Sequence, residues 1–385
     1  MAKRRANGEG SIRKRADGRW EGRYTVGHDP VTGKLIVKNV LGKTQADVKE
    51  KLKTAIEKSK GLDISKADQF TLSEWLRYWL DNYGKVYLRS SSLTNYTGFL
   101  NNQIANDPIA NVKLTKLTTN DLQQFYNRMS ESGRVQRKES RNKPKGLSAK
   151  TVRNIHCFIS HAMNRAVDEK LISENPASRC ILPKKEQKEI EILPLTDLQK
   201  FFEEAKKSGV FELYYTELAT GLRRGELLGL KWTDIDFTAN SIYIQRQITR
   251  TDGEVKESPL KTKNAYRQII VPPEVSEILK QKKDRENGFS EYVFSSPTGG
   301  PISPDSVLKM LHRVLKRAGL EKVRFHALRH TFATMALQNG VDVKTLSGLL
   351  GHYSAGFTLD TYGHITPAMK QDAAEKVGSF LSAAL

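Results

Sequence analysis

A charged segment between two prolines, LPKKEQKEIEILP at residues 182–194, interrupts this chain of 385 residues. The length exceeds that of an ordinary single domain, so two or three compact units are expected. A second polar connector, GLDISKADQ at residues 61–69, separates a strand-like region from a helical one. These breaks predict three domains, over residues 1–65, 70–180 and 195–385, with a linker over residues 181–194.

The first domain is predicted to be a three-stranded β-sheet covered by one helix. Asp17-Gly18 is a hairpin signal, and HDPVTG at residues 28–33 provides a second turn. Thr44 and Asp47 resemble a capping box at the start of the helix. The strands are expected over residues 11–15, 19–26 and 34–41. The apolar stripe that would cover the sheet consists of Val48, Leu52, Ala55 and Ile56.

The chain is strongly basic, with a formal net charge of +20 and a pI near 9.7. Residues 1–60 alone hold 16 basic and 7 acidic side chains. Such an excess is typical of nucleic-acid binding, although an anionic membrane surface also attracts it, and some soluble proteins are merely basic. A sheet with outward basic side chains can lie in a major groove, or its charges can simply be solvated. The outward candidates for DNA contact are Arg13, Arg15, Arg23 and Lys38.

Several features disfavour a membrane or secreted protein. No apolar run approaches the roughly 18–20 residues that span a bilayer. The basic N-terminus is not followed by the apolar segment of a secretory signal. Two cysteines, Cys157 and Cys180, are too few for a disulfide framework or a zinc cluster. We therefore expect a cytoplasmic protein with no membrane partner and no bound metal.

Residues 70–180 are predicted to form an all-α domain. Thr71 and Glu74 form a capping-box pattern at the start of its first helix. Further helices are expected over residues 92–103, 119–132 and 148–169. Between them, the basic loop at residues 133–146 can follow a phosphate backbone or be mobile. The core-facing stripe of the last helix consists of Val152, Ile155, Ile159, Met163 and Ala166.

Residues 195–385 are predicted to form an α-rich domain with one small β-sheet. Its strands are expected over residues 241–249 and 268–271, around a loop that holds a lysine. Five short segments of this domain carry side chains that can handle a phosphate: TGLRRGELLGL, PLKTKNAYRQIIVP, HALRHTF, LLGHYS and TLDTYGH. The six candidate catalytic residues are Arg223, Lys261, His326, Arg329, His352 and Tyr362.

These side-chain types suit phosphodiester cleavage without a metal. Arginine forks can donate two hydrogen bonds to the non-bridging oxygens, and Glu226 can orient the guanidinium of Arg223. His326 and Arg329 are three residues apart, so they share one helical face. A tyrosine phenol can attack phosphorus once it loses its proton. A lysine can protonate the 5′ oxygen as it leaves.

Each of these residues alone has a simpler structural explanation. A lone helical arginine usually forms a surface ion pair, and a lone tyrosine usually fills a core. A lysine between strands is usually solvated, and H-x-x-R spacing also occurs for structural reasons. The ordered set of six, on a basic chain without Cys/His metal clusters, is far more specific and indicates a DNA-cleaving enzyme.

The set resembles that of the tyrosine recombinases of the phage-integrase family, and most closely that of integrases from conjugative transposons and Gram-positive phages. The motif T-G-x-R-x-x-E favours Arg223 over Arg224, and L-K-T-K favours Lys261 over Lys263. The motifs match over residues 190–365, whereas the preceding regions resemble the family only in architecture. The family pattern R…K…H-x-x-R…H/W…Y falls, in order, on Arg223, Lys261, His326, Arg329, His352 and Tyr362.

The resemblance implies an arm-type DNA-binding domain, a core-binding domain and a catalytic domain. Cleavage would form a 3′-phosphotyrosine link, and four protomers would exchange strands between double-stranded DNA sites through a Holliday junction, integrating or excising a mobile element. No cofactor is implied, and accessory excision and DNA-bending proteins are. A C-terminal helix would dock on a neighbouring protomer or on its own domain. Its apolar stripe consists of Met369, Ala373, Val377, Phe380, Leu381 and Ala384.

Three rival functions fit parts of the sequence. A type IB topoisomerase would use the same chemistry, but it would not need a separate basic N-terminal sheet. A DNA-binding regulator with a degenerate catalytic fold would not retain all six residues. A metal-dependent nuclease would need clustered carboxylate ligands. We therefore expect a multidomain, mainly α recombinase with a small N-terminal sheet and a small sheet in its catalytic domain.

Overall fold

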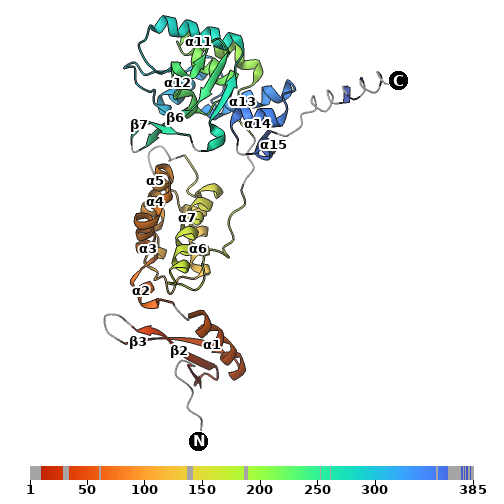
Figure 1. Ribbon diagram of the computed structural model, residues 1–385. Coiled ribbons are helices and arrows are strands. Elements are labelled where there is room, and N and C mark those ends of the chain that lie inside the picture. The colour runs from red at the N-terminus through yellow and green to blue at the C-terminus, as the bar shows by residue number, and fades with distance from the viewer. Residues whose placement is uncertain are drawn as a thin grey trace. The chain divides into compact units, whose positions relative to one another are not determined.

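The computed structural model (Figure 1) describes residues 10–28, 34–59, 62–136, 142–185, 190–251, 253–260, 262–352 and 354–362, with five residues between 374 and 382. The chain forms two compact units, Met1–Gln187 and Lys188–Leu385. The boundary between them lies in the charged segment at residues 182–194. Among the described residues, no helix is both long enough and apolar enough to cross a membrane. The mainly helical fold with small sheets confirms the predicted fold class.

The first unit begins with an antiparallel sheet in the order β1-β2-β3, covered by helix α1. Gly18 closes the predicted β1–β2 hairpin with a φ of 80°, and the amide of Asp47 donates to the Thr44 hydroxyl at the start of α1. The helix packs closely at Gly22, where an added Cβ would meet side-chain atoms of Val48 at 3.0 Å. The predicted HDPVTG turn lies largely outside the described residues. The elements are β1 (Ser11–Lys14), β2 (Trp20–His28), β3 (Leu35–Gly42) and α1 (Gln45–Ser59).

The register of the sheet corrects one predicted surface residue. Lys38 pairs with Tyr24, and it shares the face of β3 that presents Val40 to α1. Its outward placement was therefore wrong, because alternate strand residues point to opposite faces. The Lys38 Nζ instead lies 3.5 Å from the carbonyl oxygen of Thr115.

The other three basic residues lie on or beside the opposite face. Arg13 and Arg23 both contact Glu21, with Nε–carboxylate distances of 2.7 and 3.3 Å. Hydrogen bonds from Asn39 and Arg13 lower the pKa of Glu21 to about 2, so it stays ionised between them. Arg15 follows the end of β1 and lies beside Asp17.

The rest of the first unit is helical. A capping box between Thr71 and Glu74 starts α3, as the sequence predicts. The predicted helix over residues 92–103 continues from α5 into a π-helical turn, and the other two predictions match α6 and α7 closely. The predicted stripe of α7 is fully buried. The elements are α2 (Ile64–Gln69), α3 (Leu72–Trp79), η1 (Leu80–Gly84), α4 (Lys85–Tyr87), α5 (Ser90–Phe99), η2 (Leu100–Ile104), η3 (Pro108–Asn111), α6 (Thr119–Ser132) and α7 (Ala149–Asp168).

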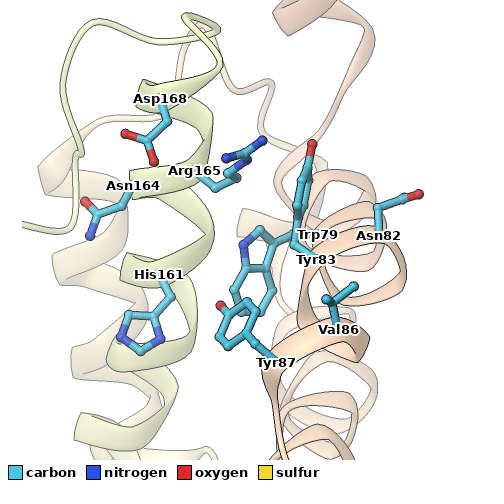
Figure 2. Close-up of a pocket in the computed structure, with 9 residues that line it drawn as sticks. All are labelled: Trp79, Asn82, Tyr83, Val86, Tyr87, His161, Asn164, Arg165 and Asp168. Atoms are coloured by element: carbon cyan, nitrogen blue, oxygen red, sulfur yellow. The ribbon is translucent and has the colours of Figure 1, made fainter.

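A surface pocket of about 500 Å³ opens between η1–α4 and α7 in this helical region. Figure 2 shows Tyr83 and Tyr87 on one wall and His161 and Arg165 on the other. The Arg165 guanidinium lies 4.3 Å from the centre of the Tyr83 ring, so a cation–π contact joins the two walls.

The second unit contains two small sheets, one in the order β4-β5-β8 and one formed by β6 and β7. The single strand predicted over residues 241–249 is therefore wrong. The chain leaves the first sheet at Gln245, where Arg246 turns to bind the buried Asp234, and enters the second sheet. The strands are β4 (Ile235–Asp236), β5 (Ser241–Ile244), β6 (Arg246–Thr251), β7 (Glu254–Pro259) and β8 (Arg267–Ile270).

Helices pack around the core of the second unit, and the β6–β7 hairpin lies at its edge (Figure 1). Helix α13 links two apolar clusters, because Leu328 belongs to the larger one and Leu337 to a smaller one that includes Tyr362. The helices are α8 (Leu198–Lys207), α9 (Phe211–Thr220), α10 (Arg224–Leu228), α11 (Pro273–Glu286), α12 (Pro304–Arg317), α13 (Phe325–Gln338), α14 (Val343–Leu350) and α15 (Ala355–Tyr362).

Candidate active site

Arg223 stands at the start of α10, directly after a tight turn. Gly221 ends α9 with a φ of 58°, and an added Cβ there would lie 2.2 Å from the ring of Phe332. Glycine is thus required both by the backbone conformation and by the space. The turn projects the Arg223 side chain, which is 36% exposed, toward the carbonyl oxygen of Gly351, to which it donates at 2.8 Å.

The buried side chain of Glu226 binds the guanidinium groups of two arginines. Its buried carboxylate accepts hydrogen bonds from Arg223 at 2.6 Å and from Arg267 at 2.9 Å. Burial opposes ionisation of Glu226, but the two guanidinium groups outweigh it and lower the pKa of this carboxyl. The carboxylate is therefore charged and fixes the direction of both guanidinium groups.

Arg329 lies below the surface, with an exposed fraction of only 1%. It donates to the carbonyl oxygens of Gly221 and Leu350, at 2.8 Å each, and so ties together the ends of α9 and α14. Burial and the charge of Arg223 lower the pKa of Arg329 to about 10, which still leaves it cationic at neutral pH.

His352 follows the end of α14, where Gly351 adopts a φ of 62°. Its Nδ1 lies 2.7 Å from the Thr358 hydroxyl. Burial, with the charges of Arg329 and Arg223, lowers the pKa of His352 to about 3. The ring is therefore neutral, and the Thr358 hydroxyl can donate to Nδ1, which leaves the proton of the ring on Nε2.

Tyr362 ends α15 and is 9% exposed. Its hydroxyl lies 2.7 Å from Nδ1 of His330, and its ring lies parallel to that of His352 at 6.4 Å between centres. Burial raises the pKa of Tyr362, while the charge of Arg329 opposes this shift. The phenol is therefore protonated at neutral pH and needs an acceptor before it can attack.

The structure brings five of the six sequence candidates together. His326 is exposed on one side, yet enclosure of its other side and the charges of His330, Arg329 and Arg223 lower its pKa to about 4. The same electrostatic neighbourhood includes His352 and Tyr362. Lys261 lies outside the described residues, and its alternative Lys263 is exposed in the short turn η7 (Lys263–Ala265).

Sequence reasoning missed four residues of this site. His330 follows His326 by four positions, and helical spacing alone could have identified it as a neighbour. Arg267 and Thr358 stand inside two of the quoted segments, PLKTKNAYRQIIVP and TLDTYGH, but the sequence does not show that they contact Glu226 and His352. Glu217 is fully buried on α9 and interacts electrostatically with Arg329, although neither of its carboxylate oxygens has a hydrogen-bond partner.

This arrangement can stabilise negative charge and transfer protons around a tyrosine hydroxyl. Two arginines supply the positive charge, and neutral histidines can accept or donate protons. In the part of the chain that the structure describes, no three or more His, Cys, Asp or Glu side chains are grouped to hold a metal ion. The site thus has the elements needed for phosphoryl transfer to a protein nucleophile.

Comparisons with known proteins identify the class. Residues 186–369 match the phage integrase family, and residues 71–130 match the N-terminal SAM-like domain of phage integrases. The chain belongs to the tyrosine recombinases of the phage integrase family, enzymes that cleave and rejoin DNA. It is 31% identical over 381 residues to a tyrosine recombinase XerC-like protein of Caldanaerobacter subterraneus subsp. tengcongensis, covering 91% of this chain and 93% of that relative.

Solved structures share the fold. The integrase of transposon Tn1549, in complex with transposon right end DNA, matches 80% of this chain and 100% of its own with a TM-score of 0.68 and 21% identity. A lambda integrase tetramer bound to a Holliday junction matches 89% of this chain and 96% of its own, with a TM-score of 0.55 and 21% identity.

Proposed function

We propose that this protein is a site-specific integrase that inserts and excises a mobile element through a 3′-phosphotyrosine intermediate. The observation that carries the proposal is the position of the Tyr362 hydroxyl beside Arg329 and His330, in one site with Arg223 and His352. A phenol held among positive charges and neutral imidazoles is suited to attack a phosphodiester.

Each side chain has a distinct role in this mechanism. Arg223 donates to a non-bridging oxygen of the scissile phosphate. Arg329, on the buried side of the site, stabilises the negative charge that grows on the phosphate oxygens. Glu226 orients Arg223 through the 2.6 Å contact. His352 donates from Nε2 to a second oxygen, since Thr358 occupies its Nδ1. Because these groups supply the charge, the proposed step requires no metal.

Proton transfer completes the step. The Tyr362 oxygen forms a bond to phosphorus while the bond to the 5′ oxygen breaks. Lys261 protonates that leaving oxygen, as a flexible ammonium group can, and His326 lies at the same site to assist. Rejoining is the reverse reaction, with a 5′ hydroxyl as the attacking group. The phosphotyrosine link thus conserves the energy of the broken bond.

The proposed DNA partners are core sites at the crossover and arm sites farther away. The helical region and the catalytic domain would hold the core site, and the N-terminal sheet would bind the arm site. The complex of the Tn1549 integrase with transposon end DNA supports binding to element ends. The basic charge of residues 1–60 supports a separate DNA contact by the sheet.

Strand exchange between two duplexes requires four active sites, so we propose a homotetramer in the synaptic complex. The lambda integrase tetramer on a Holliday junction supports this assembly. The apolar stripe of the C-terminal tail would dock on a neighbouring protomer. Of its six residues, the structure describes Val377, which is 59% exposed, and the other five lie outside the described residues. Excision factors and DNA-bending proteins would set the direction of the reaction.

The proposal is tested with duplexes cut from the DNA that flanks the gene in its host, each nicked near the candidate cleavage site so that the 5′-hydroxyl fragment is lost. The wild-type protein should form a protein–DNA adduct, with or without a chelator. Tyr362→Phe should bind the same duplexes and form no adduct. An adduct in Tyr362→Phe, or full inhibition by the chelator, would show that the mechanism is wrong.

A further inference from the structure

The contact between His330 and Tyr362 is the feature of the site that the roles above leave unused. Nδ1 of His330 lies 2.7 Å from the Tyr362 oxygen, which is a normal length for a strong hydrogen bond. His330 is on α13 and Tyr362 is on α15, so the contact crosses two helices. The oxygen at this contact is the atom that the proposed function assigns as the nucleophile.

The charged and titratable groups around His330 come from its own helix and from neighbouring segments. Arg329 precedes it, Arg324 precedes α13, and the His326 ring lies 4.6 Å away between centres. Glu191 reaches the same region and pairs with Arg324 at 2.7 Å. Burial, Arg329 and Arg324 lower the pKa of His330 to about 4, while Glu191 opposes the shift.

A histidine with this pKa is neutral at the pH of a cell. A neutral imidazole has one donor nitrogen and one acceptor nitrogen. The phenol of Tyr362 is protonated because burial raises its pKa, so it can donate to Nδ1 of His330 when the imidazole carries its proton on Nε2. In that tautomer the hydrogen bond has the direction in which a base would remove the phenolic proton.

We propose that His330 is a catalytic residue, the general base that takes the phenolic proton from Tyr362 as the hydroxyl attacks the DNA phosphate. The inference rests on the proposed function, because it needs Tyr362 to be the nucleophile. In the forward step the phenolic proton moves to Nδ1, the Tyr362 oxygen bonds to phosphorus, and the bond to the 5′ oxygen breaks. In rejoining, the imidazolium returns the same proton to the departing tyrosine, so the cycle consumes no acid or base.

Two substitutions separate a base from a residue that merely positions the tyrosine. His330→Asn places an amide oxygen near the position of Nδ1, which can accept the hydrogen bond but cannot hold the proton. His330→Ala removes the contact and leaves space for free imidazole. General-base catalysis typically contributes about 10²–10⁴-fold, so both variants should form the adduct slower by about that factor at pH 7.

The measurement is the single-turnover rate of adduct formation on a nicked duplex between pH 6 and pH 8.5. Dividing the wild-type rate by the His330→Asn rate cancels the pH dependence that comes from groups ionising in both proteins. Because hydroxide must replace the missing base, this ratio should fall about tenfold per pH unit. Added imidazole should restore part of the rate of His330→Ala and leave His330→Asn unchanged. Gel-shift binding of the same duplex checks that both variants are folded.

Three results would overturn the role of His330. A wild-type rate in His330→Asn would mean that the contact only positions the ring. A faster rate in either variant would mean that His330 restrains Tyr362. A ratio that is constant with pH, together with no rescue of His330→Ala by imidazole, would exclude proton transfer to this residue. Each result requires an adduct on Tyr362 in the wild-type protein, whereas failure of the proposed function would appear as the absence of that adduct.

Discussion

Glu226 accepts a hydrogen bond of 2.6 Å from Arg223, and this contact fixes the surface arginine of the site to the protein interior. The same carboxylate binds Arg267, which in turn donates to the carbonyl oxygen of Leu349 just before His352. One buried acid therefore connects α10, β8 and the end of α14. The integrity of the site depends on this acid as well as on the groups that would touch DNA.

Glu226→Ala should destabilise the second unit strongly. The substitution leaves the buried side of two guanidinium groups without their counter-charge, and breaking a buried pair in this way typically costs about 3–5 kcal/mol. The free energy of unfolding from a denaturant titration measures the loss. Glu254→Ala removes an exposed carboxylate paired with Lys256, so it is the matched control and should change stability by less than about 1 kcal/mol. Equal effects of the two substitutions would contradict the role of Glu226.

Thr358→Val should slow DNA cleavage without weakening DNA binding. The buried Thr358 hydroxyl lies 2.7 Å from Nδ1 of His352 and can hold the neutral ring with its proton on Nε2 by donating to Nδ1, whereas valine has nearly the same shape without a donor. Loss of one neutral hydrogen bond of about 1 kcal/mol predicts an approximately fivefold to tenfold slower adduct formation. Thr358→Ser keeps the hydroxyl and should retain most of the rate. A normal rate in Thr358→Val would show that the tautomer of His352 is fixed by something else.

Glu217→Gln should stabilise the protein at alkaline pH. Burial raises the pKa of Glu217 well above its ordinary value, with the charge of Arg329 opposing the shift. In the unfolded chain the pKa is about 4.3. At any pH between the unfolded-chain pKa and the raised pKa of the folded protein, Glu217 is protonated in the folded protein and ionised in the unfolded chain. Wild-type stability therefore falls as pH rises from about 4.3.

Unfolding free energies at pH 4, 6 and 8 test this linkage. The advantage of Glu217→Gln over the wild type should be smallest at pH 4 and grow with pH. Glu203→Gln changes an exposed carboxyl on α8 and should show no such trend. Destabilisation by Glu217→Gln at pH 8 would mean that Glu217 is ionised and supports Arg329 as a counter-charge.

Arg23→Ala and Lys38→Ala should differ in their effect on arm-site DNA. Arg23 lies on the open face of the N-terminal sheet, whereas Lys38 lies on the face covered by α1. If the open face contacts phosphates, loss of Arg23 should weaken arm-site binding and lower the slope of log affinity against log salt by about 1. Lys38→Ala should leave both unchanged. Core-site cleavage should be normal in both variants, and a larger effect of Lys38→Ala would contradict the assignment of the two faces.

Much of the fold follows from local sequence signals. The capping box at Thr71 and the stripe along α7 identify helices because their partners are three or four residues apart. The split between β5 and β6 could not be predicted, because it depends on contact of Arg246 with the distant Asp234. The face of Lys38 was mistaken because strand register fixes which residues point outward, and register depends on pairing with β2.

In the candidate site, too, the residues that stand in motifs were predictable and their contacts with one another were not. Arg223, His326, Arg329, His352 and Tyr362 stand in motifs whose residue types and order indicate phosphate chemistry. The groups that orient them lie in the same segments: Arg267 on β8, Thr358 on α15 and the backbone carbonyls of Gly221 and Leu350. The sequence does not show these pairings, because each contact forms only when the segments meet in the folded chain.

Identification of the DNA-linked residue is the most direct test of the account. The wild-type protein is trapped on a nicked duplex and digested, and the peptide that carries nucleotide mass is sequenced by mass spectrometry. We predict a 3′ phosphate esterified to the Tyr362 oxygen. A linkage to another residue, or cleaved DNA with free 3′ ends and no protein attached, would contradict it.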